Sequence, residues 1–273
     1  MPRYAFLGPE GTYSEEALLS LRLPDAEPAP YPTIGEVFLA VESGKADAGV
    51  VPIENSVEGS VNATLDALAF DHDLTISREI VLDIHHSLVV VPGLALAQIT
   101  KVVGHPQATA QCRKWIARTL PGKPIVAANS NAEAVKIAVA TPGAAAIGPA
   151  LAASLYGGEV LVEDVEDFAG NQTRFVMVGR ESAERTGKDK TSLALFMHKD
   201  KPGALLMILS EFAYGDINLT KIQSRPTKRS LGEYMFFVDL EGHVDDENVR
   251  LALSCLRLKL RTVKVLGSYP RVK

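Results

Sequence analysis

Short apolar runs alternate with segments of helical periodicity through residues 1–182. The runs have the length of buried strands, and the segments between them space their apolar residues three or four positions apart, as an amphipathic helix does. The predicted strands are 4–7, 48–53, 88–91, 101–104, 125–128, 144–147 and 175–178. The predicted helices begin at Ser14, Thr33, Ser60, Pro106, Asn131 and Pro149. This alternation predicts an α/β domain with largely parallel sheets.

A capping pattern marks several of the predicted helix starts. The sequence Ser/Thr-x-x-Glu occurs at Thr12–Glu15, Thr33–Glu36 and Ser130–Glu133. In this pattern the hydroxyl and the carboxylate satisfy backbone N–H groups of the first turn. Two of the three starts directly follow a predicted strand and a tight turn, so the positive end of each helix lies at the carboxyl edge of a sheet. Such an edge suits a ligand that carries carboxylates.

The pattern changes after a polar segment at 180–190, which has almost no large apolar residue and is typical of an exposed linker. Beyond it the predicted order is strand, helix, strand, strand, helix, strand. The elements are 191–197, 204–213, 217–224, 233–240, 245–258 and 262–266. This βαββαβ order is ferredoxin-like, and the fold alone does not define a function.

Charge is distributed unevenly over the 273 residues, whose net charge is −5. Residues 186–273 hold 15 basic and 10 acidic side chains, and residues 1–185 hold 13 basic and 23 acidic ones. The acidic larger part argues against nucleic acid as a partner. No stretch approaches the roughly 20 apolar residues that span a bilayer, so no membrane segment is expected. Cys112 and Cys255 are far apart in sequence, which indicates reduced thiols and a cytoplasmic location.

The motifs of most cofactor enzymes are absent. The chain has no G-x-G-x-x-G after a strand, no P-loop, no H-E-x-x-H and no G-x-S-x-G. No cysteine pair has zinc-ligand spacing. His85 and His86 precede a predicted strand, where neighbouring side chains point to opposite faces and do not readily bind one metal. The sequence therefore predicts no cofactor and no metal.

Six groups of residues, in order along the chain, carry a resemblance to a known family. They are 7–14 (LGPEGTYS); 51–56 (VPIENS) with 58–59; 105–107 (HPQ) with 111–112; 129–134 (NSNAEA); 146–148 (AIG) with 155–157 (LYG); and 171–175 (NQTRF). With these segments the chain resembles the prephenate dehydratases, and 173–175 matches the Thr-Arg-Phe signature of that family.

The resemblance implies a fold and a reaction. The catalytic domain, residues 1–182, would consist of two α/β lobes similar to type II periplasmic binding proteins. Lobe one would hold about 1–80 and 160–182, and lobe two about 81–159. Family members convert prephenate to phenylpyruvate, carbon dioxide and water without metal or organic cofactor. Residues 190–273 would form an ACT regulatory domain.

The same resemblance assigns candidate site residues. Thr173 is expected to donate a hydrogen bond to the leaving hydroxyl, Arg174 to bind a carboxylate, and Asn55 to assist. The expected substrate-binding residues are Thr12, Ser56, Gln111, Asn129, Ser130, Asn131 and Phe175. From the residues alone, Asn55 and Asn129 are equally typical of turns, and Ser130 of a helix cap.

The family pattern is broken at two positions. Gly104 stands where many relatives have a serine before His-Pro-Gln, so a hydrogen bond is missing or is supplied by water or a backbone N–H. Gln223 replaces a glutamate that usually begins the Glu-Ser-Arg-Pro motif, which removes a negative charge.

The C-terminal motifs imply phenylalanine as effector. Its carboxylate would bind N–H groups after Gly203, and its ammonium group would meet Asn218. The expected effector-binding residues are Gly203, Ala204, Leu205, Leu206, Asn218, Leu219, Ser224, Arg225 and Pro226. A folded but unresponsive domain is the alternative. Since such domains pair side by side, a homodimer or a dimer of dimers is expected.

Three other functions stay open at this level. The substrate is arogenate in place of prephenate, or the chain is a two-lobed binding protein without chemistry, or it is an amino-acid sensor with a degenerate first domain. The intact Thr173-Arg174-Phe175 favours an enzyme. No chorismate mutase segment is evident, so a monofunctional enzyme is expected.

Overall fold

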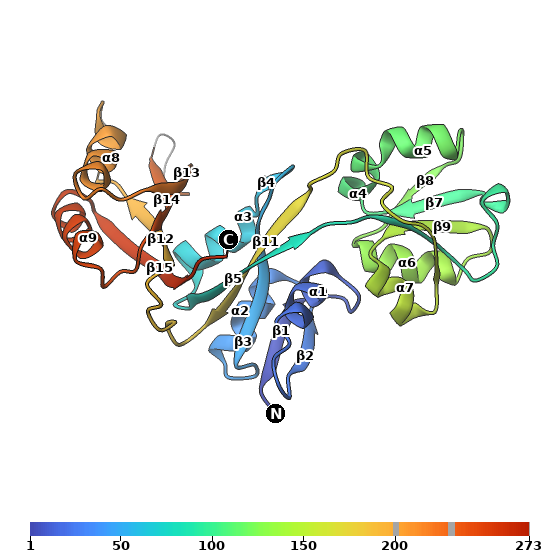
Figure 1. Cartoon of the computed structure of the whole chain (residues 1–273), viewed down its shortest axis with the longest axis horizontal. Coiled ribbons are helices and arrows are strands. Elements are labelled where there is room, and N and C mark those ends of the chain that lie inside the picture. The colour runs from blue at the N-terminus through green and yellow to red at the C-terminus, as the bar shows by residue number, and fades with distance from the viewer. Residues whose placement is uncertain (199–201, 229–232, 273) are drawn as a thin grey trace.

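The computed structural model describes residues 1–198, 202–228 and 233–272, which form three sheets (Figure 1). Lobe one contains a sheet of order β2-β1-β3-β11-β5, with β4 paired to β3. Its strands are β1 (Arg3–Leu7), β2 (Glu27–Tyr31), β3 (Ala48–Asn55), β4 (Gly59–Ser60), β5 (Thr75–Asp83) and β11 (Gln172–Gly179). Its helices are α1 (Tyr13–Ser20), α2 (Ile34–Glu42) and α3 (Asn62–Asp66), which continues as a π-helical turn at Ala67–Asp71.

Lobe two contains a sheet of order β10-β6-β9-β7-β8. Its strands are β6 (Ser87–Val90), β7 (Lys101–Gly104), β8 (Ile125–Ala127), β9 (Ala144–Gly148) and β10 (Glu159–Val162). Its helices are a 3-10 turn at Leu96–Gln98, α4 (Pro106–Gln111), α5 (Arg113–Thr119), α6 (Asn131–Val139) and α7 (Ala150–Tyr156). The chain enters this lobe after β5 and leaves it before β11, and these two neighbouring strands are antiparallel (Figure 1).

The C-terminal domain is an antiparallel sheet of order β13-β14-β12-β15. Its strands are β12 (Asp189–Phe196), β13 (Leu219–Pro226), β14 (Tyr234–Glu241) and β15 (Thr262–Pro270). Helices α8 (Ala204–Tyr214) and α9 (Glu247–Lys259) pack on one face of it. The predicted class, a two-lobed α/β domain followed by a ferredoxin-like βαββαβ domain, is confirmed. None of the helices in the described part is both long and apolar enough to cross a membrane.

The prediction of largely parallel sheets is wrong. Both lobes have mixed sheets. In lobe one this is because β11 returns from lobe two and inserts antiparallel between β3 and β5. In lobe two, β6 pairs antiparallel with β9 and β10, while β7 is parallel to β8 and β9. The pattern also missed β2, β4, β5 and β10. β2 carries two prolines and lies at a sheet edge, where proline is tolerated.

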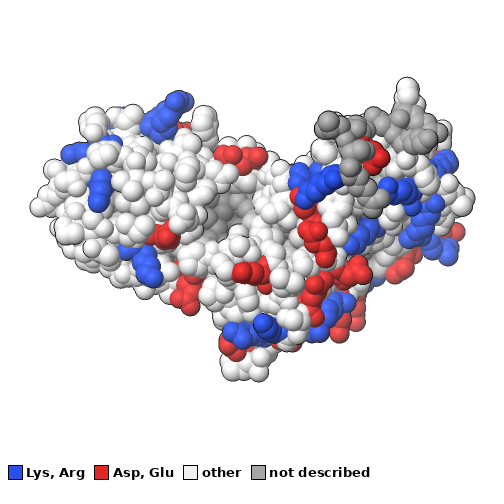
Figure 2. Space-filling model, turned by 180° about the vertical axis from the view of Figure 1, so that it is seen from behind, with Lys and Arg blue, Asp and Glu red and all other residues white. Residues whose placement is uncertain are grey.

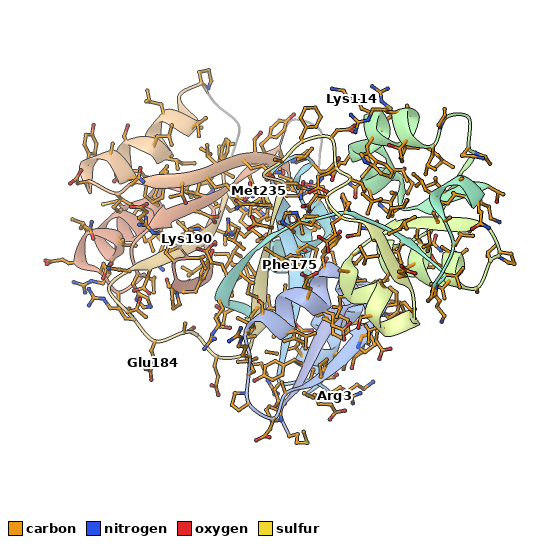
Figure 3. The ribbon with its side chains drawn as sticks, turned by 45° about the vertical axis from the view of Figure 1, so that its right-hand side comes forward. Arg3, Lys114, Phe175, Glu184, Lys190 and Met235 are labelled. Atoms are coloured by element: carbon orange, nitrogen blue, oxygen red, sulfur yellow. The ribbon has the colours of Figure 1, made fainter. Side chains whose placement is uncertain are left out.

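The C-terminal sheet is covered on both faces within one chain. The face opposite α8 and α9 packs against lobe one and shares a core with α2, α3 and β5. Phe196, Met235, Phe237 and Tyr269 contribute to this shared core, and Figure 3 labels Met235 on that sheet. Gly267 of β15 lies against β5 with φ +151°, and a Cβ there would come within 2.8 Å of the Ile76 nitrogen and nearer still to its oxygen. Only glycine permits this approach.

Candidate active site between the lobes

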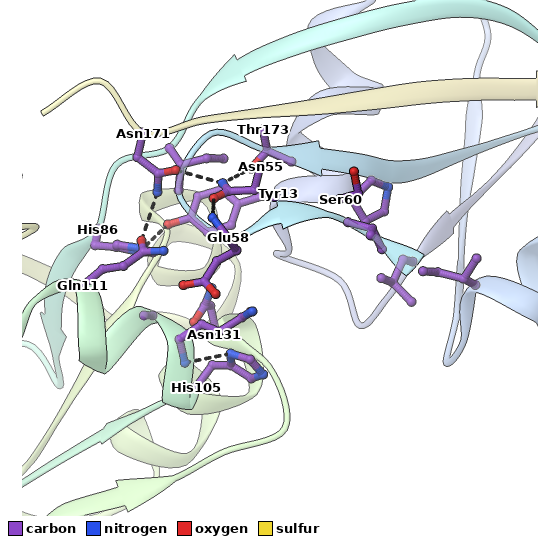
Figure 4. Close-up of a pocket in the computed structure, with 18 residues that line it drawn as sticks. Tyr13, Asn55, Glu58, Ser60, His86, His105, Gln111, Asn131, Asn171 and Thr173 are labelled. Atoms are coloured by element: carbon purple, nitrogen blue, oxygen red, sulfur yellow. Dashed lines mark hydrogen bonds between the residues drawn. The ribbon is translucent and has the colours of Figure 1, made fainter. Parts of the chain in front are cut away.

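A cavity of about 390 Å³ lies between the two lobes, within the usual size range for small-molecule sites. Lobe one contributes Tyr13, Asn55, Glu58 and Thr173, and lobe two contributes side chains such as His105 (Figure 4). Seen from behind, the molecule is hollowed between the lobes, and most of the hollow is uncharged (Figure 2). Glu58 is the one charged residue among the described residues that line the cavity, since His86 and His105 are neutral when buried.

Asn55 and Thr173 form the centre of the lobe-one wall. They are opposite each other on the antiparallel strands β3 and β11, so both side chains project from the same face. The Asn55 Oδ1 accepts hydrogen bonds from the backbone N–H groups of Val57 and Glu58 at 2.9 and 3.0 Å. This contact orients the amide, and its Nδ2 donates to the Thr173 Oγ1 at 2.8 Å. Thr173 is therefore an acceptor towards Asn55, and its own hydroxyl hydrogen is available to the cavity.

The orientation of Asn55 sets the direction of a longer hydrogen-bond chain. Asn55 Nδ2 also donates to Asn171 Oδ1 at 2.8 Å, and Asn171 Nδ2 then donates to Gln111 Oε1 at 3.0 Å. Because that oxygen is an acceptor, the His86 Nε2 at 3.0 Å must carry a hydrogen. The Tyr13 hydroxyl lies 2.9 Å from His86 Nδ1 and 2.6 Å from the His85 carbonyl oxygen, so its one hydrogen serves two acceptors.

Burial favours the neutral forms of the histidine and tyrosine side chains that line the cavity. It lowers the pKa of His86 below its ordinary value, and the contacts with Gln111 and Glu166 oppose that shift only in part. Burial likewise lowers the pKa of His105. The pKa of Tyr13 is raised well above its ordinary value, first by burial and then by Glu16. The cavity is thus lined by neutral donors and acceptors.

The predicted site residues divide into three sets. Four line the cavity described above, namely Asn55, Gln111, Asn131 and Thr173. Asn129 and Ser130 line a neighbouring cavity of about 920 Å³ between the lobes. The remaining four, Thr12, Ser56, Arg174 and Phe175, line neither cavity among the described residues.

The start of α6 has the expected capping box, except that the Glu133 carboxylate binds the N–H of Asn129 instead of that of Ser130. Ser130 Oγ accepts from the Glu133 N–H at 3.0 Å, and Glu133 Oε2 accepts from the Asn129 N–H at 2.7 Å. Asn131, the first residue of α6, faces the cavity, and its Oδ1 is buried without a hydrogen-bond partner. At the start of α1 the expected cap is not formed, because the Thr12 hydroxyl donates to the Leu7 carbonyl oxygen at 2.9 Å.

Three expected substrate contacts are made to other parts of the protein. The Ser56 Oγ accepts from the Gln172 N–H at 2.9 Å, which joins β3 to β11. Phe175 is 2% exposed and packs with Phe6, Leu18 and Ile80 in the core of lobe one (Figure 3). Thr12, as described, is bonded to the backbone. Thr173 and Phe175 are two residues apart on β11, so their side chains project from the same face of the sheet. At Phe175 this face is covered by α1, and the ring is therefore buried in the core instead of lining the cavity.

Arg174 points away from the cavity, and its predicted contact with a substrate carboxylate is not available in this structure. As the neighbour of Thr173 in a strand it projects from the opposite face, towards the C-terminal domain. Its guanidinium nitrogens lie 2.6 Å from Asp239, 3.1 Å from Glu79 and 2.9 Å from the Tyr269 hydroxyl. Burial by itself would lower the pKa of Arg174, but these oxygens raise it further above its ordinary value.

Thr109 explains how Gly104 is accommodated. A Cβ at Gly104 would lie 2.5 Å from the Thr109 Cγ2. The Thr109 side chain therefore fills the space that a serine at position 104 would need. Its hydroxyl donates back to the carbonyl oxygens of His105 and Pro106 at 3.3 and 3.1 Å, and so it does not replace a serine hydroxyl in the cavity.

The sequence interpretation missed Tyr13, Glu58, His86, His105 and Asn171 as cavity residues. Tyr13 and Asn171 lie inside the quoted family segments, but polar residues in a motif do not reveal which of them face the ligand. The sequence interpretation considered His86 only as a metal ligand together with His85, and not as a cavity residue. The signal available was its position directly before β6, where the chain crosses between lobes.

Only one group in the described residues brings three possible metal ligands together. His85, Asp164 and Glu166 lie on the two segments that connect the lobes, outside the cavity. The His85 Nδ1 is 2.9 Å from Asp164 and 3.2 Å from Glu166, and Glu166 also accepts from the His86 N–H. These contacts join the two connecting segments to each other.

The predicted effector residues lie in two places. Gly203, with φ +84°, begins α8, and Gly203, Ala204, Leu205 and Leu206 line a cavity of about 370 Å³. Asp200 and Lys201, which precede Pro202 and Gly203 in the sequence, lie outside the described residues. Leu219 begins the edge strand β13 and Asn218 directly precedes it, while Ser224, Arg225 and Pro226 lie at the other end of the strand. Arg225 pairs with Asp66 of lobe one, and Gln223 accepts from Ser60 at 2.5 Å, so this motif contacts the catalytic part.

The fold and the cavity define a two-lobed ligand-binding α/β domain joined to a small regulatory domain. The family model for prephenate dehydratase matches residues 4–183, and that for the ACT domain matches residues 191–254. The chain belongs to the prephenate dehydratase family.

The chain is similar to several known proteins over nearly its whole length. A prephenate dehydratase of Mycolicibacterium vanbaalenii is 43% identical, with 99% of this chain and 91% of that protein covered. A structure of prephenate dehydratase from Arthrobacter aurescens with L-Phe is 41% identical with TM-score 0.90, covering 98% and 90% of the two chains. A structure described as a novel type of quorum quenching acylase, GqqA, is 30% identical with TM-score 0.88, covering 99% and 98%.

Proposed function

We propose that the chain converts prephenate to phenylpyruvate, carbon dioxide and water, with Thr173 as the hydrogen-bond donor to the leaving hydroxyl. The observation that carries this proposal is the direction of the Asn55–Thr173 hydrogen bond. Since the backbone of Val57 and Glu58 orients Asn55, the Thr173 oxygen accepts and its hydrogen is left for the substrate.

The electron flow requires little more than this donor. The bond between the ring and its carboxylate breaks and releases carbon dioxide, and its electron pair moves into the ring. The ring becomes aromatic as the opposite carbon–oxygen bond breaks, and the oxygen departs as hydroxide. Thr173 stabilises the developing charge, and one proton from solvent completes the water. Such assistance typically contributes about 10²–10⁴-fold.

We propose that neutral groups hold the two substrate carboxylates. Arg174 is engaged with the C-terminal domain, and the described cavity lining contains no lysine or arginine. The candidates on lobe two are His105, Gln107 and Asn131, the last at the positive end of α6. Glu58 lines the same cavity, and its carboxylate disfavours additional negative charge beside it.

An acylase is a second candidate function, because a structure with that description shares the fold at 30% identity. Acyl transfer usually needs a hydroxyl or thiol nucleophile bonded to a base. In the described cavity the Thr173 hydroxyl is bonded to the Asn55 amide, and His86 is bonded to Tyr13 and Gln111. This arrangement favours the dehydratase.

We propose that residues 1–182 form the catalytic domain and residues 190–273 the ACT regulatory domain. Phenylalanine is the proposed effector, bound at Gly203–Leu206 of one chain with Asn218 of a second chain. The support is the cavity at the start of α8, the free edge of β13, and the relative whose structure contains L-Phe. Edge pairing of two copies would give the homodimer or dimer of dimers. The proposed location is the cytoplasm, where the free thiols Cys112 and Cys255 stay reduced.

The test is a turnover assay with Thr173→Val and Thr173→Ser. Purified protein is mixed with prephenate at neutral pH without metal, and phenylpyruvate is followed by its absorbance in alkali. Valine keeps the shape of threonine without the hydroxyl, so kcat should fall about 10²–10⁴-fold, whereas serine should retain most of it. Added phenylalanine should change the rate of the wild-type protein.

Parallel assays use arogenate and an acyl-homoserine lactone. Turnover of arogenate in place of prephenate would change the substrate but keep the site. Hydrolysis of the amide bond of the acyl-homoserine lactone, without turnover of prephenate or arogenate, would favour the acylase. Absence of turnover with all three would refute the enzyme and leave a ligand-binding sensor.

A further inference from the structure

The ladder between β3 and β11 is irregular beside the catalytic pair. Thr173 faces Asn55 and Arg174 faces Glu54, but Phe175 faces Pro52, so Ile53 has no partner on β11. Proline has no N–H to donate, which accounts for the irregularity at this point. A bulge weakens the ladder locally and redirects the side chains next to it. The extra residue lies on β3, while β11 stays in a regular ladder with β5 at Thr173 and Arg174. Contacts of the neighbouring side chains therefore add to that ladder in fixing the direction of Thr173.

Arg174 supplies such a contact from the other face of the strand. Its side chain is 12% exposed and its Nη1 lies 2.6 Å from Asp239 of β14. Its Nη2 donates to the Tyr269 hydroxyl of β15 at 2.9 Å. Ser192 of β12 in turn bonds both Asp239 and Tyr269 at 2.6 Å. Three strands of the C-terminal sheet thus hold one side chain of the catalytic strand.

Glu54 repeats this arrangement on β3. Its carboxylate lies 3.4 Å from Arg174 and 3.1 Å from the Lys221 amine of β13. Lys190 of β12 pairs with Glu79 of β5 at 2.7 Å, and Glu79 also contacts Arg174. The cluster contains three basic and three acidic side chains, Arg174, Lys190, Lys221, Glu54, Glu79 and Asp239, so its charges balance. Glu54, which precedes Asn55, and Arg174, which follows Thr173, are therefore both held by side chains of the C-terminal domain.

We propose that Arg174 is a positioning residue: the C-terminal domain, through Asp239 and Tyr269, holds Arg174 and thereby aims Thr173 at the leaving hydroxyl. This inference rests on the proposed role of Thr173. It assigns the arginine of the Thr-Arg-Phe segment to the junction between the domains. Because Arg174 and Thr173 are consecutive residues, a shift of the C-terminal sheet that moves Arg174 would also move Thr173.

The test compares two single-hydroxyl deletions at the same junction. Tyr269→Phe removes the hydroxyl that bonds Arg174. Thr75→Val removes a hydroxyl that joins β5 to the Leu266 carbonyl oxygen at 3.2 Å, away from Arg174. Tyr269→Phe should lower kcat for prephenate about tenfold at unchanged KM, because misaimed catalytic groups lose rate while the substrate contacts remain. Thr75→Val should leave kcat within about twofold of the wild type. Asp239→Asn keeps the side-chain shape and serves if Tyr269→Phe does not fold.

Hydrogen exchange of the peptides that cover β11 gives a readout without turnover. Faster exchange at 172–175 in Tyr269→Phe, but not in Thr75→Val, is expected. Unchanged kcat and exchange in a folded Tyr269→Phe or Asp239→Asn protein would overturn the inference, as would an equal loss in Thr75→Val. Failure of the proposed function would instead appear in the wild-type protein as absent turnover, and the exchange comparison would still decide the positioning role.

Discussion

The two faces of the β3–β11 pair carry opposite kinds of chemistry. On the cavity face, Asn55 and Thr173 are neutral; backbone N–H groups orient Asn55, which donates a hydrogen bond to Thr173. One residue away on each strand, Glu54 and Arg174 are charged and are paired within the junction with the C-terminal domain. Strand alternation alone separates the two sets.

This difference follows from what each face has to bind. A substrate with two carboxylates requires hydrogen-bond donors and is repelled by a further carboxylate nearby. Neutral donors in a site that excludes water stabilise developing negative charge strongly. A junction between two domains can contain charges provided that each is paired, since an unpaired buried charge is costly. Exchange of charge between the two faces should therefore have very different consequences.

The largest effect is expected from Asn55→Asp, which places a carboxylate on the cavity face at unchanged size. The variant loses the donor to Thr173 and repels the substrate, so kcat/KM should fall about 10²–10³-fold. The matched change on the opposite face is Glu54→Gln, which weakens the contacts of β3 with the C-terminal domain and should lower kcat/KM by no more than about tenfold. Steady-state rates with prephenate measure both. Equal losses in the two variants would contradict the separation of the faces.

A large loss of stability is expected from Gly267→Ala at the junction itself. The new Cβ would collide with the Ile76 backbone of β5, and the alanine backbone would have to adopt φ +151°. Overpacking and backbone strain together should cost about 3 kcal/mol of unfolding free energy. Denaturant unfolding measures this loss. Gly187→Ala is the control, because Gly187 also has a positive φ but nothing lies within 4 Å of a Cβ there.

The fold class was predictable from sequence because each lobe repeats strands and helices with clear periodicity. The mixed sheets were not, since the pattern at β11 gives no direction, and its place between β3 and β5 depends on contacts distant in sequence. Polar edge strands such as β2 gave no apolar run at all.

The site was predictable in part. Asn55, Gln111, Asn131 and Thr173 were placed at a ligand by their motifs, and the cavity contains them. Arg174 was misplaced because a motif does not state which face of a strand each residue occupies until the strand's partners are known. His86 was overlooked because its role depends on Gln111 and Tyr13, which come from other elements.

A smaller effect is expected at Gly104, where the family resemblance led us to expect a serine. Gly104→Ser would collide with the stiff, β-branched Thr109, so the unfolding free energy should fall by about 1–3 kcal/mol. Thr109→Ala in the same protein should restore most of this loss, because it vacates the space. Thermal unfolding of the single and double variants measures the coupling. Additive effects of the two changes would contradict the assignment of Thr109 as the residue that fills the serine site.

The smallest effect concerns the pH dependence that the neutral cavity face imparts. Burial lowers the pKa of His86 in the folded protein, with Gln111 and Glu166 opposing the shift and His85 adding to it. The unfolded chain therefore takes up a proton first as the pH falls. The stabilisation is complete above the unfolded pKa of about 6.5 and is lost as the pH falls from there to the lower folded pKa. Over that window the unfolding free energy should decrease by at most about 1.4 kcal/mol per pH unit.

His86→Gln removes the titrating ring and keeps a polar side chain, so the slope of the unfolding free energy below about pH 6.5 should become shallower. His243→Gln is a control on the C-terminal domain, away from the cavity face. Both slopes are measured by denaturant unfolding at a series of pH values. A slope unchanged by His86→Gln would mean that the cavity tolerates a charged ring. The contrast between a neutral cavity face and a charged junction face would then be one of contacts and not of electrostatics.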